Sequence, residues 1–303
     1  MGKQAIEIVA FIGAGIMGAA IVRRFLGAGF RVRVWNRTEE KLRPLVNLGA
    51  EWAASPAAAA DGADIVCLCV ADRSAVETVI FGELGVCSVA QPPALLVDFS
   101  TIGPGATKDF AARLQAACGT SWVDAPVSGG VIGAESGRLV VFCGGKPEDI
   151  EYLAPVFAAC AQRTTRTGEI GAGQALKLCN QLVVASNLVA IAELMSLAQA
   201  SGLELAQVPQ ALAGGFADSI PLQIFGRRMA EGVRSPVLGE LSLMLKDLTM
   251  VEDLMRQYGR DLPLTRAALE VYRRAAREGL SHEDLAALST LYLGSRHPRA
   301  SDS

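Results

Sequence analysis

The sequence of 303 residues predicts an α/β fold, in which a doubly wound parallel sheet is followed by a long interdomain helix and an all-α C-terminal domain. In the first half, short apolar runs alternate with helical patterns, as is typical of βαβ units. After Gly171 the strand-like runs stop, and a continuous apolar helical pattern begins at Gln174. We therefore expect two domains, residues 1–170 and residues 171–303.

The expected strands of the first domain are short runs that are mostly apolar on both faces, as strands in the middle of a parallel sheet must be. They are Ile6–Ile12, Arg31–Trp35, Ile65–Val70, Leu95–Asp98, Ser121–Asp124 and Leu139–Cys143. Cys67 and Cys69 lie on one face of the third run. Because no further metal ligands stand near them in the sequence, we interpret them as small core residues.

The second domain shows only helical periodicity. The expected helices are Gln174–Ser201, Leu205–Leu212, Ile220–Glu231, Leu241–Tyr258, Leu264–Glu278 and Ser281–Leu293. Ser281, followed three residues later by Asp284, predicts a capping box for the last helix. The polar tail Ser295–Ser303 is expected to be disordered.

Composition excludes several classes of function. A net charge of −3 argues against binding to nucleic acid or to a membrane surface. Seven scattered cysteines favour a reducing cytoplasm over a disulfide framework. The two histidines, His282 and His297, do not provide a His-rich metal site, and we expect no bound metal.

Neither a secretory signal nor a membrane span is expected from the sequence. One of the two longest uncharged stretches is Leu178–Ala192, which contains four polar residues. At about fifteen residues it is shorter than the roughly twenty that a membrane span needs. We interpret it as part of a buried helix.

A glycine-rich segment directly follows the first expected strand and precedes a helical pattern. It reads Gly13-Ala14-Gly15-Ile16-Met17-Gly18. In this context Gly-x-Gly-x-x-Gly is the fingerprint of a dinucleotide-binding Rossmann domain. Gly13 permits the tight turn, Gly15 lets the backbone approach a pyrophosphate, and Gly18 lets the helix pack on the strand. We expect all six residues to contact the cofactor.

The end of the second strand predicts which dinucleotide is bound. NAD-binding domains place an Asp or Glu there to hold the ribose hydroxyl, whereas this chain has Asn36-Arg37-Thr38. A guanidinium and a hydroxyl bind a 2′-phosphate well, so we predict NADP(H), with NAD(H) as the alternative. A second interpretation is that Thr38 only caps a helix beginning at Glu39 while Arg37 is solvated.

Three further segments are unusually polar or glycine-rich. They are Asp98-Phe-Ser-Thr-Ile-Gly-Pro-Gly105, Asp124-Ala-Pro-Val-Ser-Gly-Gly130 and Gly171-Ala-Gly-Gln-Ala-Leu-Lys-Leu-Cys-Asn-Gln181. Together with the glycine turn, and from Ile6 to Leu293, the chain resembles the β-hydroxyacid dehydrogenase family. That family includes 3-hydroxyisobutyrate dehydrogenases, tartronate semialdehyde reductases and glyoxylate/succinic semialdehyde reductases. The resemblance implies an enzyme that interconverts a small 3-hydroxy acid and its semialdehyde, with NADP(H) expected from residues 36–38. The resemblance and the apolar helical half together predict a homodimer or homotetramer.

The resemblance also assigns catalytic residues. Lys177 matches the lysine that exchanges a proton with the substrate oxygen. An ordinary lysine has a pKa of about 10.4, so this role requires burial, which Ala175, Leu176, Leu178 and Cys179 are expected to supply. The alternative is that Lys177 has no catalytic role and that its side chain extends from the helix to solvent.

Asn180 and Gln181 share the helix face of Lys177 and match the residues that bind and orient the substrate. Some family members have a second Asn where this chain has Gln181. The alternative is that these amides only satisfy other buried groups.

The remaining site residues follow from the resemblance as well. Ser128, Gly129 and Gly130 match a clamp for the substrate carboxylate, although Ser-Gly-Gly alone would indicate a turn. Thr101 matches a contact to the nicotinamide, with helix capping near Pro104 as the alternative. Val70 and Ala71, at the end of a strand, would pack along the cofactor.

Two segments of the helical domain carry further expectations. Lys246, in the pair Lys246-Asp247, matches a lysine that reaches the cofactor, with an ion pair on the helix surface as the alternative. The chain departs from the family at Leu238-Gly239-Glu240, where an aromatic residue is usual, so the substrate pocket is expected to differ. The segment Gly214–Ser219 is a candidate for selecting the substrate.

Two other functions remain as alternatives. An imine reductase would share this fold, but its lysine position is typically occupied by another residue, so Lys177 argues against it. A non-catalytic dinucleotide-binding regulator would not need Lys177 and Asn180. Both alternatives are therefore less consistent with the sequence than a hydroxyacid dehydrogenase.

Overall fold

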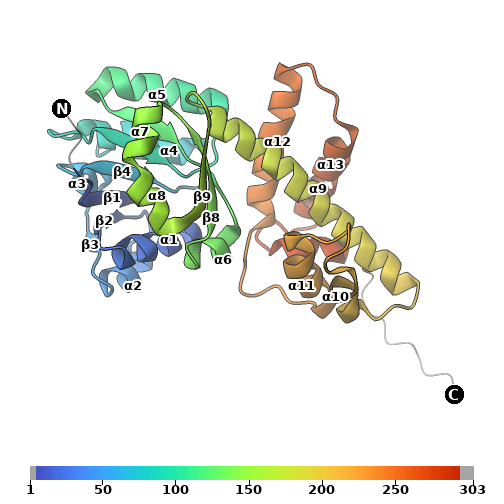
Figure 1. Cartoon of the computed structure of the whole chain (residues 1–303). Coiled ribbons are helices and arrows are strands. Elements are labelled where there is room, and N and C mark those ends of the chain that lie inside the picture. The colour runs from blue at the N-terminus through green and yellow to red at the C-terminus, as the bar shows by residue number, and fades with distance from the viewer. Residues whose placement is uncertain (1–4, 294–303) are drawn as a thin grey trace. The chain divides into compact units, whose positions relative to one another are not determined.

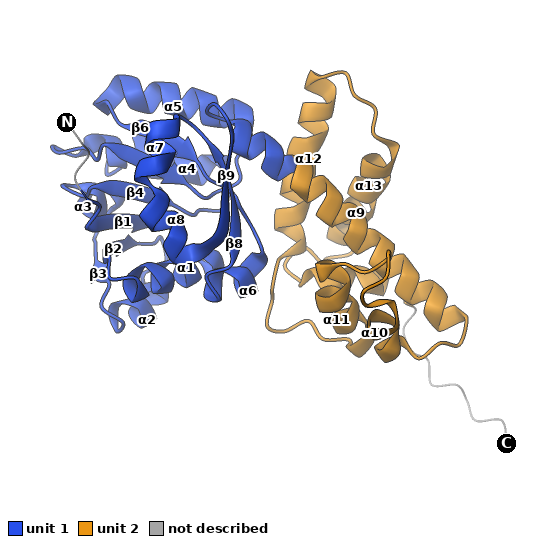
Figure 2. Cartoon of the chain, viewed as in Figure 1, with its two compact units in different colours: residues 1–178 blue, residues 179–303 orange. Residues whose placement is uncertain are grey.

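In the computed structural model, which describes residues 5–293, the chain forms two compact units (Figure 1). Unit 1 comprises residues 1–178 and unit 2 comprises residues 179–303 (Figure 2). We expected the boundary between residues 170 and 171, just before the long helix. The division between the units falls inside that helix, after Leu178.

Unit 1 is built around a nine-stranded sheet with the order β3-β2-β1-β4-β5-β6-β8-β7, in which β9 also pairs with β8. The strands are β1 (Ile8–Ile12), β2 (Arg31–Trp35), β3 (Glu51–Trp52), β4 (Ile65–Leu68), β5 (Leu95–Asp98), β6 (Ser121–Asp124), β7 (Val127–Ser128), β8 (Leu139–Gly144) and β9 (Ala161–Gly168). Strands β1 to β6 are parallel, whereas β8 is antiparallel to β6 and β7. The strand order reverses between β1 and β4, which is the point where doubly wound sheets bind ligands.

Helices cover both faces of this sheet. They are α1 (Ile16–Gly27), η1 (Glu39–Leu42), α2 (Arg43–Val46), α3 (Pro56–Ala60), α4 (Arg73–Phe81), η2 (Val86–Ser88), α5 (Pro104–Cys118), α6 (Gly130–Glu135), α7 (Pro147–Tyr152), α8 (Ala154–Cys160) and the start of α9 (Ala172–Ala200). Alternate residues of β1 enter different cores: Phe11 packs with Phe25 of α1, and Ile12 belongs to the cluster that contains Phe110 of α5. The doubly wound fold is thus confirmed.

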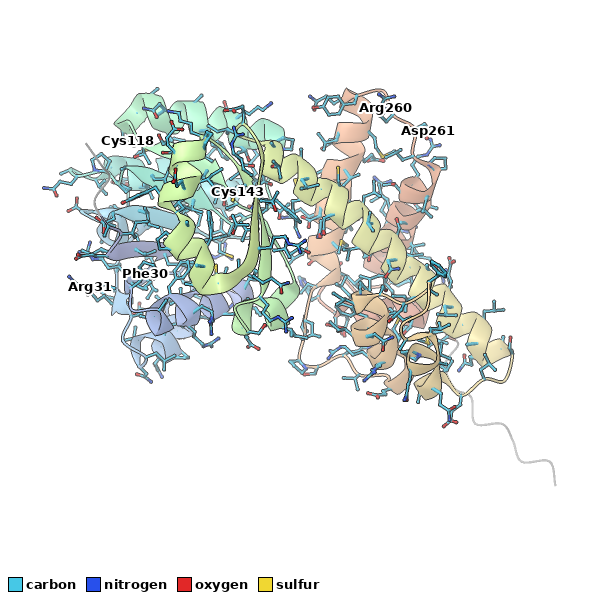
Figure 3. All side chains as sticks on the ribbon, in the orientation of Figure 1. Phe30, Arg31, Cys118, Cys143, Arg260 and Asp261 are labelled. Carbon is cyan, nitrogen blue, oxygen red and sulfur yellow. The ribbon has the colours of Figure 1, made fainter. Side chains whose placement is uncertain are left out.

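Cysteines contribute to these cores as expected. Cys67 is fully buried on β4, and Cys143 lies on β8 in the interior of unit 1 (Figure 3). Cys69 is half-buried, just past the end of β4. Between residues 5 and 293, no group of three or more His, Cys, Asp or Glu side chains is arranged to hold a metal ion.

The apolar strands were easier to predict than the polar ones. Arg31–Trp35, Leu95–Asp98 and Ser121–Asp124 have the predicted bounds. The first and third expected strands are shorter, because β1 begins at Ile8 and β4 ends at Leu68. Strands β3, β7 and β9 were not predicted, since β3 and β7 have two residues each and β9 is largely exposed and polar.

Unit 2 is helical. After α9 it contains η3 (Leu205–Gln207), α10 (Val208–Leu212), η4 (Leu222–Gly226), α11 (Arg227–Glu231), α12 (Leu241–Gln257), α13 (Pro263–Arg277) and η5 (Leu285–Leu291). Its core combines Leu188 and Met195 of α9 with Leu248 of α12 and Tyr272 of α13. Two expected helices are mixed: Leu205–Leu212 starts as a 3₁₀ turn, and Ile220–Glu231 contains the π-helical turn η4.

The expected last helix, Ser281–Leu293, is wrong in type and in start. The segment is the 3₁₀ helix η5, and Asp284 is its N-cap, with a carboxylate that accepts from Ala286 N at 3.0 Å. Ser281 does not cap it; its carbonyl accepts from Ser242 N at 2.9 Å. Asp284 is therefore the cap and not the distal member of a capping box. The tail Ser295–Ser303, with His297, lies outside the described residues.

Helix α9 is longer than the uncharged stretch suggested. With 29 residues it is long and apolar enough to cross a membrane by length and composition alone. In its most apolar window, 44% of the residues are buried within the protein. These include Leu188, Ala192 and Met195, which form part of the core of unit 2. This segment therefore serves as a core helix of unit 2.

A buried ion pair organises the segment before α12. Asp284 is fully buried, and its carboxylate lies 3.2 Å from Nε of Arg228. The same carboxylate accepts from Leu238 N at 2.7 Å, and Arg228 donates to the carbonyl of Pro236 at 2.7 Å. The chain between Pro236 and Leu238 is thereby held against α11 and η5.

We expect Asp284→Ala to lower the free energy of unfolding by about 3–5 kcal/mol, because it leaves the largely buried Arg228 without its carboxylate. Urea unfolding monitored by circular dichroism measures this loss. Asp253→Ala is the control, since Asp253 pairs with Arg256 at 2.7 Å between side chains that are 64% and 68% exposed. It should cost less than about 1 kcal/mol. Equal losses in the two variants would contradict the importance of the buried pair.

Candidate active site

The glycine turn lies at the reversal point of the sheet. Gly13 N donates to the carbonyl of Trp35 at the end of β2, at 2.9 Å. Beside it, Cys69 N donates to the carbonyl of Ile12, also at 2.9 Å. The turn between β1 and α1 is therefore fixed to both neighbouring strands at their carboxyl ends, where a dinucleotide binds in such sheets.

The three glycines have different surroundings. Gly13 has a φ of +97°, and a Cβ there would lie 2.3 Å from the carbonyl oxygen of Cys69. A Cβ at Gly18 would lie 2.0 Å from the carbonyl oxygen of Gly13. At Gly15, by contrast, a Cβ meets no other atom of the described residues within 4 Å. The turn needs Gly13 and Gly18 for packing, and the open side at Gly15 fits a pyrophosphate at the N-terminus of α1.

The end of β2 has no carboxylate at residues 36–38. Asn36 Nδ2 donates to the carbonyl of Thr38 at 2.8 Å, and both Arg37 and Thr38 are exposed. Thr38 occupies the N-cap position of η1, but its side chain makes no capping hydrogen bond. The hydroxyl of Thr38 therefore does not serve as the helix cap that the second interpretation proposed.

The segment after β5 is connected to the end of β4. The hydroxyl of Ser100 accepts from Val70 N at 3.0 Å, and Ser100 N donates to the buried Asp98 carboxylate at 2.9 Å. The next residue, Thr101, is half-buried. The N-cap of α5 is Gly103, so Thr101 is not the cap that the alternative interpretation expected.

Gln174, in the first turn of α9, holds the same segment from the other side. Its Nε2 donates to the carbonyl of Ser100 at 2.8 Å. Its Oε1 accepts from Ile102 N at 3.1 Å and from Gly103 N at 3.2 Å. The side chain is fully buried. One amide thus connects the start of α9 to the backbone on both sides of Thr101.

Asp124, the last residue of β6, binds backbone N–H groups at the N-terminus of α9. Its carboxylate accepts from Gly171 N at 2.7 Å and from Gln174 N at 2.9 Å. A Cβ at Gly144 would lie 2.5 Å from the Asp124 carboxylate, and one at Gly173 would lie 2.8 Å from it. Burial raises the pKa of Asp124 to about 6, although hydrogen bonds from the backbone partly oppose that shift.

The predicted carboxylate clamp lies between β7 and α6. Ser128 pairs with Val140 of β8, and its side chain is half-buried. Gly129 and Gly130 have φ of +120° and +60°, respectively, and both are exposed. These positive φ values favour glycine at both positions for structural reasons alone. The binding of a carboxylate here stays a prediction.

Lys177 lies one turn after Gln174 on α9 and is only 9% exposed. It therefore does not extend to solvent as an isolated surface lysine would. Leu178 is buried as expected, but Leu176 is 40% exposed and Cys179 is exposed, so these two do not supply the expected burial. On a helix, they point away from the face that Gln174 and Lys177 share.

Within unit 2, Asn180 and Gln181 belong to a polar chain that ends on α12. Asn180 Nδ2 donates to Gln181 Oε1 at 3.0 Å, and Gln181 Nε2 donates to the Asp247 carboxylate at 2.6 Å. Lys246 Nζ lies 3.3 Å from the same carboxylate. The ion pair considered for Lys246 thus exists, and Gln181 satisfies a buried side chain. Contacts of these residues with substrate or cofactor stay predictions.

The two expected specificity segments differ from one another. Phe216, in the segment Gly214–Ser219, is fully exposed, and the Asp218 carboxylate accepts from Gly214 N at 2.7 Å. Gly239, in the segment Leu238-Gly239-Glu240, packs so closely that a Cβ would lie 3.0 Å from Leu285 Cδ1.

Unit 1 brings several predicted residues to one edge of the sheet. The glycine turn, Val70 and Thr101 follow strands there, Ser128 is the last residue of β7, and Lys177 lies on the helix that Asp124 and Gln174 attach to this edge. Asn180, Gln181 and Lys246 belong to unit 2. The sequence interpretation gave no role to Asp124 or Gln174. The signal was a polar residue at a strand end and another at a helix start, each within a segment already recognised as unusual.

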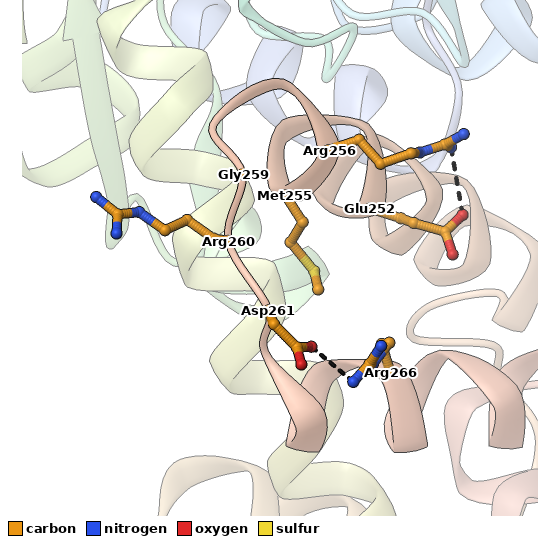
Figure 4. Close-up of a pocket in the computed structure, with 7 residues that line it drawn as sticks. All are labelled: Glu252, Met255, Arg256, Gly259, Arg260, Asp261 and Arg266. Carbon is orange, nitrogen blue, oxygen red and sulfur yellow. Dashed lines mark hydrogen bonds and ion pairs between the residues drawn. The ribbon is translucent and has the colours of Figure 1, made fainter.

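A separate open pocket occurs between α12 and α13 of unit 2 (Figure 4). Arg260, on its rim, points away from the other lining side chains (Figure 4). Arg256 lies 3.5 Å from Glu252, and Arg266 lies 2.6 Å from Asp261. Since these guanidinium groups are paired with carboxylates, the pocket offers little net positive charge to an anion.

The fold and the glycine turn define an NAD(P)-binding α/β protein with an additional helical unit. Residues 8–168 match the family model for the NAD-binding domain of 6-phosphogluconate dehydrogenase. Residues 171–292 match the model described as NAD-binding of NADP-dependent 3-hydroxyisobutyrate dehydrogenase.

Individual relatives agree with these matches. The chain is 34% identical to 2-hydroxy-3-oxopropionate reductase of Escherichia coli, over 92% of this chain and 94% of that protein. The crystal structure of 3-hydroxyisobutyrate dehydrogenase from Salmonella typhimurium superposes with a TM-score of 0.88 at 27% identity, over 94% of this chain and all of that one. Psf3, solved in complex with NADP⁺ and 2-OPP, gives a TM-score of 0.87 at 28% identity, over 93% and 99% of the two chains.

The chain belongs to the β-hydroxyacid dehydrogenase family. Its resemblance to that family is confirmed, and the relatives indicate an NAD(P)-dependent hydroxyacid dehydrogenase.

Asp124 should give the stability of the protein a defined pH dependence. Its pKa is raised from 3.8 to about 6 in the folded chain, so the folded state binds more protons than the unfolded state between these values. The free energy of unfolding therefore falls as the pH rises through this range. Relative to Asp124→Asn, the wild type should lose about 2 kcal/mol of stability between pH 4.5 and 7.5. Urea unfolding of both proteins across this range measures the difference, and a constant difference would contradict the raised pKa.

Proposed function

We propose that the protein is an NADP-dependent oxidoreductase that interconverts a small 3-hydroxy acid and its semialdehyde. The observation that supports this most directly is the burial of Lys177 on α9, one turn after the residues that attach this helix to the ends of β5 and β6. The glycine turn lies at the same edge of the sheet. A buried lysine at this place suits a proton donor next to a bound dinucleotide.

In the proposed reaction the side chains hold the substrate and move one proton. When bound in unit 1, the nicotinamide would supply the hydride that the carbonyl carbon takes up. Lys177 donates a proton to the carbonyl oxygen, and it accepts that proton in the reverse direction. Ser128, Gly129 and Gly130 hold the substrate carboxylate, and Asn180 with Gln181 orients the hydroxyl-bearing carbon.

The cofactor side is assigned to unit 1, with Lys246 as a further contact. Gly13, Ala14, Gly15, Ile16, Met17 and Gly18 would hold the pyrophosphate, and Val70, Ala71 and Thr101 would flank the nicotinamide half. Asn36, Arg37 and Thr38 would bind the adenosine ribose. The exposed guanidinium of Arg37, with no carboxylate beside it at residues 36–38, favours a 2′-phosphate and hence NADP(H).

We also propose that the enzyme forms a homodimer or homotetramer. On α9, Val183 and Leu197 are 63% and 69% exposed in the single chain. A second copy that packs against this helix would cover both side chains. Light scattering after size-exclusion chromatography is expected to give the mass of a dimer or tetramer; a monomer mass at micromolar concentration would contradict this.

The scattered cysteines and the net charge of −3 suit a cytoplasmic enzyme with small-molecule partners. We accordingly propose a carboxylate-bearing substrate and neither a nucleic-acid nor a membrane partner.

Oxidation of NADPH with glyoxylate, succinic semialdehyde, tartronate semialdehyde and methylmalonate semialdehyde tests the function. With the best substrate, we expect Lys177→Ala to lower kcat at least about 100-fold, because the proton donor is lost. Its NADPH affinity should change little. Lys146→Ala, at an exposed lysine of unit 1, is the control and should keep full activity. Near wild-type turnover in a folded Lys177→Ala protein would refute the role of Lys177.

Cofactor preference is tested at Arg37. The wild type should have a lower KM for NADPH than for NADH. Arg37→Gln should raise the KM for NADPH about 10- to 100-fold and leave that for NADH nearly unchanged, because only the 2′-phosphate loses a charged partner. Arg43→Gln, at a nearby exposed arginine on α2, should change neither value. A wild-type preference for NADH would overturn the assignment.

A further inference from the structure

The amide of Gln174 is unusual in that one fully buried side chain makes three hydrogen bonds to a single loop. Its NH₂ group faces the carbonyl of Ser100, whereas its oxygen faces the N–H groups of Ile102 and Gly103. Only this orientation of the amide places donors against acceptors throughout. The geometry therefore specifies a primary amide of this length.

The loop and the helix that Gln174 joins carry two different parts of the predicted site. The loop, residues 100–103, contains Thr101, and the hydroxyl of Ser100 also accepts from Val70 N at 3.0 Å. The helix contains Lys177, three residues after Gln174 and on the same face. The backbone N–H of Gln174 is itself held by the Asp124 carboxylate at 2.9 Å. Gln174 is thus fixed at both ends.

We propose that Gln174 is a positioning residue that sets the placement of Lys177 relative to the 100–103 loop, and hence to the nicotinamide that this loop contacts. The inference rests on the proposed function. Gln174 exchanges no proton and need not touch the substrate. It acts because hydride and proton transfer require the reacting groups to be aligned closely, and a misplacement of about 1 Å costs roughly 100-fold in rate.

A purely structural role makes a different prediction. If Gln174 only filled the core, its replacement would lower the melting temperature, and losses in cofactor affinity and turnover would follow together. A positioning role instead lowers kcat while the folded protein still binds NADPH. The two roles are therefore separated by measuring kcat, the Kd for NADPH and the melting temperature on the same variants.

The principal variant is Gln174→Met, which keeps the length of the side chain and removes all three hydrogen bonds. We expect kcat to fall about 10- to 100-fold, with the Kd for NADPH changed less than about 3-fold. NADPH deuterated at the transferred position should show a larger isotope effect on kcat than in the wild type, because hydride transfer becomes more rate-limiting. Gln115→Met, at an exposed glutamine of α5, is the matched control and should resemble the wild type.

Hydrogen exchange tests the contacts without turnover. The amides of Ile102 and Gly103 should exchange at least about 10-fold faster in Gln174→Met than in the wild type, since each loses its acceptor. Unchanged exchange at both amides would overturn the inference, because the loop would then not depend on Gln174.

Gln174→Glu supplies a second variant with a pH readout. A protonated Glu repeats the native pattern, with O–H donating to Ser100 and C=O accepting from the two N–H groups. The ionised form loses the donor. The ionisable groups on the surrounding elements include Asp98 of β5, Asp124 of β6, Lys108 of α5 and Lys177 of α9 itself. Relative to the wild type, kcat of Gln174→Glu should recover towards low pH and fall towards high pH, and a flat ratio would contradict the inference.

The outcomes separate this inference from the proposed function. If the wild type reduces none of the four aldehydes, the proposed function fails, while the exchange rates of Ile102 and Gly103 still report whether Gln174 holds the loop. If the wild type is active and Gln174→Met keeps its kcat, positioning by Gln174 is refuted. Proportional losses of melting temperature, NADPH affinity and kcat would likewise refute it in favour of a structural role.

Discussion

The hydrogen bonds between the Asp124 carboxylate and the first turn of α9 are the constraint on which much of unit 1 depends. A helix start leaves several N–H groups without partners, and a carboxylate at that end also interacts favourably with the helix dipole. Asp124 meets both requirements from the end of β6, at 2.7 and 2.9 Å. Burial penalises its charge, as the pKa of about 6 indicates. Glycines 144 and 173 are needed because side chains there would collide with this carboxylate.

Gln174, whose backbone N–H is bound by Asp124, connects the start of α9 to the ends of the other strands. Gln174 bonds the backbone of the loop after β5, and Ser100 in that loop bonds Val70 after β4. The carboxyl ends of three neighbouring strands and the start of α9 thereby form one hydrogen-bonded network. Such buried networks are stable when every member is satisfied, and they hold their members in one arrangement. Lys177 lies on α9 one turn after Gln174, so its position is set by the edge of the sheet and not by flexible loops.

Much of this was predictable from the sequence where a residue pattern has one physical cause. The apolar run Leu95–Val97 predicted β5 to the residue, because a central parallel strand must be apolar on both faces. The polar strand β9 was not predicted, because its pairing with β8 is set by tertiary structure. Asp284 was expected to be the second member of a capping box that begins at Ser281. Instead, it is itself the N-cap of η5, and it pairs with Arg228, which is distant in sequence. Asp124 and Gln174 were missed for the same reason, because their partners lie up to 74 residues away.

The polar chain of unit 2 explains why residue 181 is a Gln and not a shorter Asn. Gln181 gives its NH₂ group to Asp247 at 2.6 Å and its oxygen to Asn180 at 3.0 Å. Asp247 in turn lies 3.3 Å from Lys246. With both ends of its amide engaged in these bonds, Gln181 connects Asn180 of α9 to α12. An Asn in place of Gln181 would be one methylene shorter and could not keep both contacts without movement of α12. The extra length of Gln181 is thus explained by the distance to Asp247.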